Sequence, residues 1–455
     1  MDTRISVFGL GKLGIPMALC IAKSGIDVIG VDISESVINK LNKGQSPIKE
    51  PDVEKLLKST QDRFTSTTNM EKAVLGTNIS FIVVPTPSEN NGSFSLKYVK
   101  EVASEIGKSM AKKSTYHLVV LTSTVLPGST EYGIQPILER ESGKICGKGF
   151  GLCYNPEFIA LGSVIQDFLN PDFLLIGESD SRAGKMLEEL LKSITKNDPP
   201  VQKMNFINAE IAKISLNAFV TTKITFANML SDMSGRLPNA DVDTITDAIG
   251  LDSRIGRRYL NGGLSYGGPC FPRDNRALGY IADKFDCNSL ISKSTDQFNQ
   301  YHLENTLEII QDHTKLRGSI AVLGLSYKPN SDVLDESPGL YLAKKLSTIG
   351  YKVKAFDPVA MENARVIFKN SIYCADSIND CLSGVETVVI ANPDSKFRSM
   401  SALDIHQNQR TVTVIDCWRM LRNELENKDR IVYVGLGIGK QSTQNESYLT
   451  EIWNA

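Results

Sequence analysis

The chain has 455 residues, of which 41% are apolar and 22% are charged, and this composition fits a folded protein of two or three domains. A net charge of -2 gives no bulk electrostatic reason to bind nucleic acid or an anionic membrane, so neither partner is expected. The first residues lack the apolar stretch of a signal peptide, and no apolar run approaches the roughly 20 residues of a membrane span. We therefore expect a cytoplasmic protein.

The eight cysteines are scattered along the chain without CxxC spacing. This spacing argues against both a zinc knuckle and a disulfide framework. The four histidines stand alone in the sequence and add no metal signature. We expect no metal ion.

The first βαβ unit carries a glycine-rich turn. A strand over 5–9 runs into Gly9-Leu10-Gly11-Lys12-Leu13-Gly14, a helical segment follows, and a second strand over 28–32 ends in Asp32. The glycines allow a tight turn and the close approach of a pyrophosphate to the N-terminus of the helix. An acid about 20 residues further on accepts hydrogen bonds from ribose hydroxyls and repels a 2′-phosphate. The sequence therefore predicts a site for NAD rather than NADP.

Polar residues follow the next strands. Strands are expected over 79–84, 118–122 and 174–177 with helices between them, which predicts a parallel, doubly wound sheet. Ligands bind at the carboxyl ends of such strands. The segments there are Pro85-Thr86-Pro87, Ser123 to Gly128 and Asn155-Pro156-Glu157-Phe158. Each of them alone is more typical of a turn than of a site.

A helical pattern extends from Asn208 to about Arg236, without an internal glycine or proline until Gly235. A helix of this length usually joins domains or builds a dimer interface. Lys213 and Asn217 are spaced i, i+4 and so share one face. A second helix, over 241–249, leads to a turn that contains Arg254.

The turn Gly267-Gly268-Pro269-Cys270-Phe271-Pro272-Arg273-Asp274 places one thiol among glycines and prolines. The glycines let the backbone approach a ligand closely, the prolines stiffen the loop, and Asp274 lies one turn beyond Cys270 if a helix starts there. This arrangement is typical of a presented nucleophile. A buried cysteine beside a turn is the alternative.

The α/β pattern restarts after a boundary at 314–318. Strands are expected over 319–324, 352–357, 387–390 and 413–416, and a helix near 340–349. Only one glycine of the dinucleotide fingerprint is present at Gly324-Leu325-Ser326, so no second NAD site is expected. Residues 433–439 are interpreted as a glycine-rich turn.

These motifs predict an α/β chain of two Rossmann-like, doubly wound parallel-sheet domains joined by a helical domain with a long central helix. We expect the NAD-binding domain over 1–205. The helical central and dimerisation domain, with the cysteine turn, is expected over 206–314. A C-terminal Rossmann-like domain is expected over 315–455.

Taken together and in this order, the motifs resemble those of the UDP-glucose/GDP-mannose dehydrogenase family, over essentially the whole chain. The resemblance implies that NAD oxidises a sugar-nucleotide alcohol to the acid, and that the C-terminal domain binds the nucleotide diphosphate. It implies that Cys270 forms a thiohemiacetal and then a thioester. Lys213 and Asn217 would stabilise the substrate oxygen, and Thr124, Glu157 and Asp274 would position or deprotonate water.

The resemblance also implies which residues hold the two ligands. The implied cofactor-binding residues are Gly9, Gly11, Lys12, Leu13, Gly14, Asp32, Thr86, Thr124 and Lys328. The implied substrate-binding residues are Glu157, Lys213, Asn217, Arg254, Gly267, Gly268, Tyr327, Lys328 and Arg419. Arg254 would reach the substrate of a neighbouring subunit, so a homodimer or a larger homo-oligomer is expected.

The chain departs from the family pattern at two places. Leu161 stands where many UDP-glucose members have a second glutamate, and this bears on the identity of the sugar. Asp335 stands before Glu336-Ser337-Pro338, where the family commonly has an arginine that contacts the cofactor.

UDP-glucose is the expected donor, and a UDP-N-acetylhexosamine or GDP-mannose is the next choice. A two-electron hydroxyacid or 6-phosphogluconate-type dehydrogenase is an alternative, but it leaves the third domain and Cys270 unexplained. A non-catalytic nucleotide-sensing protein is an alternative from another class.

Overall fold

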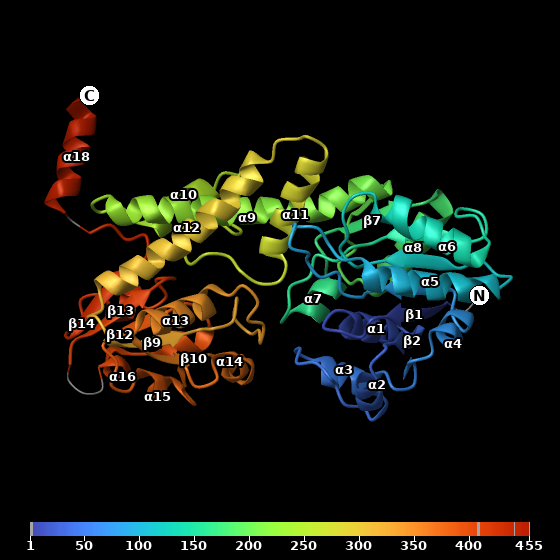
Figure 1. The fold of residues 1–455 in the computed structure, drawn as a ribbon, viewed down its shortest axis with the longest axis horizontal. Helices are drawn as coiled ribbons and strands as arrows, with labels where there is room; N and C mark the ends of the chain where they lie inside the picture. The colour runs from blue at the N-terminus through green and yellow to red at the C-terminus, as the bar shows by residue number, and fades with distance from the viewer. Residues whose placement is uncertain (1–2, 407–409, 441, 455) are drawn as a thin grey trace. The chain divides into compact units, whose positions relative to one another are not determined.

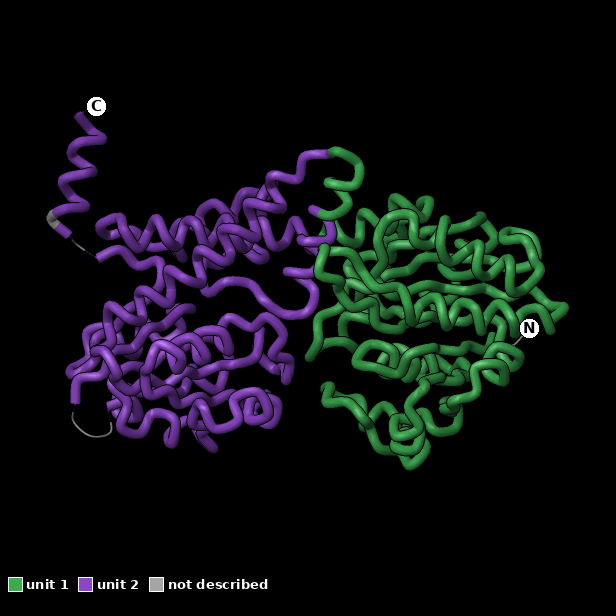
Figure 2. Tube along the Cα trace, in the orientation of Figure 1, with its two compact units in different colours: residues 1–216, 280–286 green, residues 217–279, 287–455 purple. Residues whose placement is uncertain are grey.

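The computed structural model describes residues 3–406, 410–440 and 442–454. These residues form two compact units, shown in different colours in Figure 2. Unit 1 contains the chain up to residue 216 together with residues 280–286. Unit 2 contains residues 217–279 and the chain from residue 287 on. Helices α9 (Phe206–Arg236) and α11 (Phe271–Lys284) each begin in one unit and end in the other.

Unit 1 is built on one sheet, whose eight strands all lie within the continuously described residues 3–216 (Figure 1). In spatial order the strands are β3 (Phe64–Thr67), β2 (Asp27–Val31), β1 (Arg4–Phe8), β4 (Ile79–Ile82), β5 (Leu118–Leu121), β6 (Gly151–Tyr154), β7 (Leu174–Glu178) and β8 (Val201–Met204). The order reverses between β1 and β4, which is where doubly wound sheets bind nucleotides.

The helices of unit 1 cover both faces of this sheet. They are α1 (Gly14–Lys23), α2 (Glu35–Asn42), α3 (Val53–Ser59), α4 (Met70–Leu75), α5 (Lys97–Ala111), η1 (Ser129–Ile134), α6 (Gln135–Ser142), α7 (Val164–Leu169) and α8 (Ser181–Ile194). Successive side chains of a strand point to opposite faces. Accordingly Ile5 and Val7 belong to one hydrophobic cluster, and Phe8 belongs to the other. The expected doubly wound fold is confirmed.

The prediction that all strands of this sheet are parallel is wrong for its last two strands. Strands β1 to β6 are parallel, but β7 pairs antiparallel with β6, and β8 follows the direction of β7. The connection from β6 to β7 contains only α7, whose six residues span about 9 Å. So short a helix does not carry the chain back along the sheet, and the strand that follows runs the other way.

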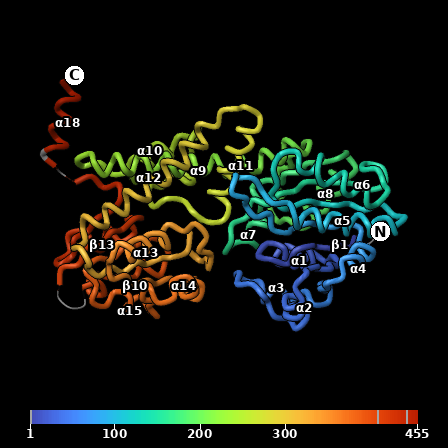
Figure 3. Tube along the Cα trace, viewed as in Figure 1, coloured from blue at the N-terminus to red at the C-terminus, as the bar shows by residue number. Residues whose placement is uncertain are grey.

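The first half of unit 2 is helical. It contains most of α9, then α10 (Val242–Gly250), most of α11 and α12 (Leu290–Asp312). The long helix was expected from Asn208, and the structure begins it at Phe206. Helix α12 crosses α9 obliquely (Figure 3), and Asn305 Nδ2 of α12 donates to Asp232 Oδ1 of α9 at 3.0 Å.

The second half of unit 2 is a parallel sheet. Among the described residues its six strands are, in spatial order, β11 (Tyr373–Cys374), β10 (Lys352–Phe356), β9 (Ser319–Leu323), β12 (Thr387–Ile390), β13 (Val412–Asp416) and β14 (Ile431–Gly435). The elements around it are α13 (Pro338–Ile349), α14 (Met361–Phe368), α15 (Ile378–Leu382), η2 (Ser395–Ser399), α16 (Ala402–Ile405) and α17 (Arg422–Leu425), and α18 (Thr443–Asn454) follows β14.

Strand β14 corrects the interpretation of residues 433–439 as a turn. Ile431 to Gly435 pair with β13 and form the edge of the sheet, and only Leu436 to Gly439 lie beyond the strand. In the sequence, the glycines that directly follow residues 431–434 make this short strand hard to recognise. In the part of the chain that the structure describes, no helix combines the length and the apolar character that a membrane span requires.

Candidate active site

The three glycines of the turn after β1 have different surroundings: two are closely packed and one is open. Gly9 has a φ of 98°, and a Cβ atom there would lie 2.6 Å from the carbonyl oxygen of Val83. A Cβ atom at Gly14 would lie 1.8 Å from the carbonyl oxygen of Gly9, so the first turn of α1 packs directly on the strand end. A Cβ atom at Gly11 would meet no protein atom within 4 Å. The turn is therefore rigid at both ends and open in the middle.

Asp32 follows β2 and closes this turn from the side. Its Oδ2 accepts a hydrogen bond from the N–H of Leu10 at 2.8 Å, and its Oδ1 accepts one from Ser34 at 2.9 Å. Asp32, Lys12 and Leu13 all keep part of their surface exposed. Carboxylate oxygens carry further lone pairs, so Asp32 can still accept from ribose hydroxyls. An open Gly11 beside a helix start and this acid fit the pyrophosphate and ribose of NAD.

In the second sheet, too, the start of a helix packs on the glycine at the end of a strand. A Cβ atom at Gly339 of α13 would lie 2.1 Å from the carbonyl oxygen of Gly324, as Gly14 lies against Gly9. Here, however, residues 325–338 separate the two glycines. The acid after β10, Asp357, is buried, and its Oδ2 accepts from the N–H groups of Leu325 and Ser326 and from the Ser326 hydroxyl. Its Oδ1 accepts from residues 359 and 360.

The loops after β4 and β5 are held together by Thr86. Its hydroxyl donates to the carbonyl oxygen of Thr124 at 2.7 Å, so both predicted residues lie at one edge of the sheet of unit 1. The loop that carries Thr124 is also fixed by Glu210, which sequence analysis did not assign. The buried Glu210 carboxylate accepts from the N–H groups of Gly128 and Thr130, at 2.6 and 2.8 Å. The sequence signal for Glu210 is its i, i+3 spacing from Lys213, which places both residues on one face of the helix.

Lys213 and Glu157 meet in unit 1. Lys213 is buried, and its Nζ donates to the carbonyl oxygen of Glu157 at 2.7 Å and lies 4.6 Å from the ring centroid of Phe158. Glu157 as a residue keeps some exposed surface, but desolvation raises the pKa of its carboxyl to about 7, and the Lys213 ammonium acts against this rise. A carboxyl with a pKa near neutrality is suited to proton transfer at physiological pH.

The cysteine turn leads from buried backbone to an exposed thiol. Residues 262–268 are buried, whereas Pro269 and Cys270 are exposed, and α11 begins at Phe271. By contrast, Cys20, Cys153, Cys381 and Cys417 are buried. The helix start that the presented-nucleophile hypothesis requires is thus present, because the N–H of Asp274 bonds to the carbonyl oxygen of Cys270 at 2.8 Å.

Asn217 and Asp274 meet in unit 2. Asn217 Nδ2 donates to Asp274 Oδ2 at 2.6 Å, and both side chains are buried. The other oxygen of Asp274 accepts from Arg273, whose Nη2 lies 2.8 Å away. The amide and the carboxylate therefore orient each other one turn from the thiol. On α9, Asn217 follows Lys213 by one helical turn, as predicted.

The two glycines before Cys270 make room for protein atoms. A Cβ atom at Gly268, whose φ is 85°, would lie 2.4 Å from the ring of Tyr327. A Cβ atom at Gly267 would lie 2.2 Å from the carbonyl oxygen of Glu336. The loop between β9 and α13 therefore packs directly on the cysteine turn. The sequence predicts that these glycines let a ligand approach closely, and in the structure they also let Tyr327 and Glu336 approach.

The residue that departs from the family pattern takes part in this contact through its backbone. The N–H of Gly268 donates to the carbonyl oxygen of Asp335 at 3.0 Å, a bond that does not depend on the side chain at 335. Arg276 of α11 and Glu336 form an ion pair beside it. Tyr327 and Lys328, in the same loop, keep part of their surface exposed.

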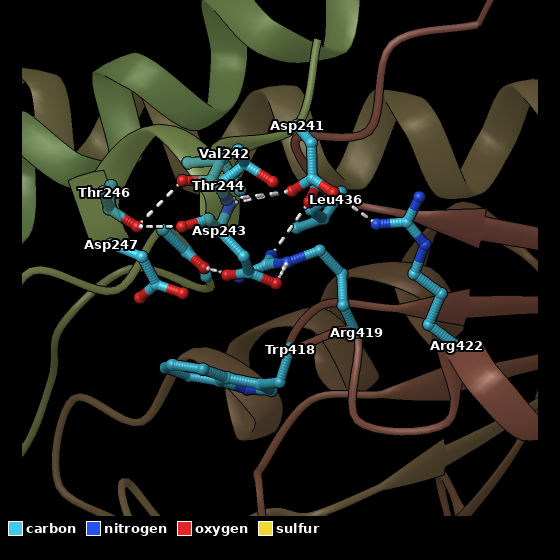
Figure 4. Close-up of polar contacts among 12 residues, drawn as sticks. Asp241, Val242, Asp243, Thr244, Thr246, Asp247, Trp418, Arg419, Arg422 and Leu436 are labelled. Atoms are coloured by element: carbon cyan, nitrogen blue, oxygen red, sulfur yellow. Dashed lines mark hydrogen bonds and ion pairs between the residues drawn. The ribbon is translucent and has the colours of Figure 1, made fainter. Parts of the chain in front are cut away.

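Arg419 does not point a free guanidinium at solvent. Figure 4 shows its side chain directed at Asp243 of α10, where Nε and Nη2 form a bidentate pair at 2.8 and 2.7 Å. Nη1 donates to the carbonyl oxygen of Leu436 at 2.8 Å, and Nη2 also donates to that of Gly262. The Arg419 side chain is 3% exposed. Its predicted role in substrate binding stays a prediction, and binding would require it to exchange one of these contacts.

Arg254 lies in the turn after α10 and is 86% exposed. Its guanidinium pairs with Asp252, with Nη2 2.6 Å from Oδ2. The side chain is therefore accessible, and its charge is partly compensated within the turn. In the described part of the chain, no group of three His, Cys, Asp or Glu residues is arranged to hold a metal ion.

The open glycine turn with its acid fits an NAD-dependent oxidoreductase. An exposed thiol one helical turn before the buried Asp274, which pairs with Asn217, fits covalent chemistry. Comparison with known proteins gives the same class. Residues 3–195 match the NAD binding domain, residues 207–301 the central domain and residues 321–423 the UDP binding domain of the UDP-glucose/GDP-mannose dehydrogenase family. The chain belongs to this family of nucleotide-sugar dehydrogenases, and its cofactor is NAD.

The relatives act on more than one sugar nucleotide. The chain is 35% identical to a UDP-glucose 6-dehydrogenase of Haloferax volcanii, over 92% of this chain and 97% of that protein. It is 36% identical to a GDP-mannose 6-dehydrogenase of Pseudomonas aeruginosa, over 87% and 92%. Among solved structures, a UDP-glucose dehydrogenase of Pyrobaculum islandicum aligns with a TM-score of 0.88 and 32% identity, over 96% of this chain and 98% of that one.

Proposed function

We propose that the protein oxidises UDP-glucose to UDP-glucuronate in two successive NAD-dependent steps. The observation that carries the proposal is the exposed Cys270 at the start of α11, one turn from the buried Asn217–Asp274 pair. A two-electron alcohol dehydrogenase has no need of a thiol. In an enzyme that takes an alcohol to a carboxylate, a thiol serves to retain the aldehyde covalently for the second oxidation.

The bound NAD supplies a hydride acceptor for each of the two oxidations. Between them, the Cys270 thiolate adds to the aldehyde carbon, and a proton is delivered to the former carbonyl oxygen. Loss of the second hydride from this thiohemiacetal leaves a thioester on Cys270. Water then attacks the thioester, the C–S bond breaks, and the acid and the free thiol are produced. One sugar nucleotide, two NAD+ and one water thus give the acid, two NADH and two protons.

Each of the other residues has a proposed role that its surroundings support. The Lys213 ammonium stabilises negative charge on the substrate oxygen, and Asn217 donates a hydrogen bond to it. Glu157, with its pKa near 7, removes a proton from water or from the alcohol. Thr124 helps to orient water, and Asp274 holds Asn217 in place. For substrate binding we propose Gly267, Gly268, Tyr327, Lys328 and Arg254, with Arg419 subject to the exchange of contacts described above.

The choice of UDP-glucose as substrate is tested with a panel of sugar nucleotides. Values of kcat/KM are measured for UDP-glucose, UDP-N-acetylglucosamine, UDP-N-acetylmannosamine and GDP-mannose. We expect UDP-glucose to be the best substrate and to yield two NADH per sugar. GDP-mannose is the second candidate, because a relative of nearly equal identity bears that name. A tenfold preference for any other sugar overturns the choice of donor.

The yield of NADH per sugar distinguishes this four-electron oxidation from two different functions. A yield of one NADH per substrate indicates a two-electron dehydrogenase, and binding of NAD and UDP without turnover indicates a sensing protein. A cytoplasmic location is part of the proposal. It is supported by the thiols, since none of the eight cysteines, all of which the structure describes, is in a disulfide.

We further propose a homodimer built on α9. Phe219, Phe226 and Met233 recur every seven residues, which places them on one stripe of the helix, and their exposed fractions are 67%, 46% and 50%. Arg254 of one protomer would then reach the substrate of its partner. Mixing inactive Arg254→Ala and Cys270→Ala subunits should restore part of the activity, since one hybrid site keeps both residues. Verified heterodimers without activity contradict a shared site.

A further inference from the structure

Glu50 connects two segments of unit 1 that are far apart in the sequence. It lies in the loop before α3, and its Oε2 accepts a hydrogen bond at 2.9 Å from the N–H of Gly162, 112 residues away. Its Oε1 accepts one at 3.0 Å from the N–H of Val164. Hydrogen bonds from N–H groups to a carboxylate are stronger than those between neutral groups. Glu50 therefore ties the loop before α3 to the start of α7.

Helix α7 needs this partner because its own residues do not cap it. The first N–H groups of a helix have no acceptor within the helix. Ser163, at the N-cap, accepts no hydrogen bond from the helix, and its hydroxyl donates to Asp167 Oδ2 at 2.7 Å. The same Asp167 oxygen accepts from the N–H of Ala160 at 3.0 Å. Glu50 thus satisfies the N–H of Val164, which is the first residue of α7.

The segment that ends at α7 begins at Glu157. Lys213 Nζ donates to the carbonyl oxygen of Glu157 at 2.7 Å, so Lys213 holds the start of this segment and Glu50 holds its end. Between them lies Leu161, whose side chain has no polar atom to form an anchor of its own. The segment 157–164, which carries Glu157, is thus held through its backbone at both ends.

We propose that Glu50 is a positioning residue for Glu157, acting through the start of α7. Glu50 contacts no reacting atom and exchanges no proton. It fixes the segment 157–164, and so keeps the Glu157 carboxyl oriented and poorly hydrated while the substrate is oxidised. The inference rests on the proposed function, in which Glu157 removes a proton.

The test variant is Glu50→Gln, which keeps the size of the side chain but replaces one acceptor oxygen by an NH2 group that faces a backbone N–H. We expect kcat to fall about tenfold, because the proton acceptor is displaced, while KM for NAD stays unchanged. The midpoint of the pH profile of kcat/KM should move from near 7 toward the ordinary range of a carboxyl. Glu54→Gln is the matched control, since Glu54 is exposed on α3, four residues further on, and it should leave both quantities unchanged.

Two readouts do not depend on turnover. Amide hydrogen exchange in residues 160–166 should be faster in Glu50→Gln than in the control. The titration of Glu157, followed by carbon-13 NMR and assigned with Glu157→Gln, should move to lower pH. If no sugar in the panel is oxidised, the proposed function fails, whereas these two shifts still support the positioning role.

Unchanged exchange, or faster exchange with an unmoved Glu157 titration and an unmoved pH profile, overturns the inference. If Glu50→Gln does not fold, Glu50→Asp serves instead. It keeps the charge but is one methylene shorter, so smaller shifts in the same directions are expected, and their absence overturns the inference equally.

Discussion

The ring of Tyr327 fills the space that a side chain at residue 268 would occupy, so the turn that carries Cys270 is shaped by the loop between β9 and α13. Residue 268 also has a φ of 85°, a conformation that L-residues adopt at a cost of about 1–2 kcal/mol. The position of the thiol therefore depends on a contact with a residue 59 positions further along the chain.

Gly268→Ala should reduce kcat on the order of a hundredfold, because the added methyl group displaces the turn from the Tyr327 ring. Binding of NAD, measured by titration calorimetry, should be unchanged. Gly350→Ala is the control, since Gly350 has a φ of 108° but no atom within 4 Å of its Cβ position. If both variants lose activity equally, backbone strain rather than the Tyr327 contact is responsible.

Cys270→Ser should bind NAD and the sugar nucleotide but lose complete oxidation, with kcat lowered on the order of a thousandfold or more. A serine forms and releases an ester less readily than a cysteine forms and releases a thioester. NADH formation and the yield of acid are measured together. Cys287→Ser, at another exposed cysteine, should behave as the wild type. Normal turnover of Cys270→Ser excludes the nucleophile role.

Glu157 should make both activity and stability depend on pH near neutrality. Its pKa is raised to about 7 in the folded chain from an ordinary value of 4.5, so the proton-accepting form appears, and kcat/KM rises, as pH passes 7. The unfolded chain loses this proton at lower pH. The folded state is therefore penalised increasingly from pH 4.5 to 7, and the full penalty, at most about 3 kcal/mol, applies above 7.

Glu157→Gln removes this penalty. The stability of the variant relative to the wild type should therefore be greater at pH 8 than at pH 4, as measured by urea unfolding at both values. The rise of kcat/KM through pH 7 should disappear in the same variant. A constant stability difference between the two pH values contradicts the raised pKa.

Arg419 and Asp243 should show strong coupling in stability. Arg419→Ala is expected to lower the free energy of unfolding by about 1–3 kcal/mol, because the carbonyl oxygens of Gly262 and Leu436 lose their donor, whereas Asp243 is 41% exposed and stays hydrated. A double-mutant cycle with Asp243→Ala should give a coupling of about 1–3 kcal/mol by urea unfolding. A coupling near zero would show that the carbonyl oxygens of Gly262 and Leu436 hold Arg419 without the carboxylate. If KM for the sugar nucleotide also rises in Arg419→Lys, the predicted substrate role gains support.

Local signals in the sequence were enough for the main elements of the site. The turn from Gly9 to Gly14, the i, i+4 spacing of Lys213 and Asn217, and the cysteine turn each lie within one short segment, where turn and helix chemistry allow few conformations. The structure contains each of these elements at the expected residues.

Contacts between segments that are distant in the sequence could not be predicted from local signals. The pairing of Glu50 with Gly162, of Arg419 with Asp243 and of Tyr327 with Gly268 depends on which elements the fold brings together, and no local periodicity encodes it. The reversed direction of β7 was missed for a similar reason, since direction is set by the short α7 rather than by the strand.

The two sheets also share a joint, in which a glycine at the end of the first strand accepts the first turn of the next helix against its carbonyl group. At Gly9 and Gly14 the intervening backbone is short and faces open space, whereas between Gly324 and Gly339 it extends into a loop that packs on the cysteine turn. The connection between strand and helix is thus short in one sheet and long in the other, where it also contacts another part of the chain. A Rossmann-like scaffold used twice in one polypeptide can in this way form the NAD-binding turn in one domain and support the predicted catalytic turn from the other.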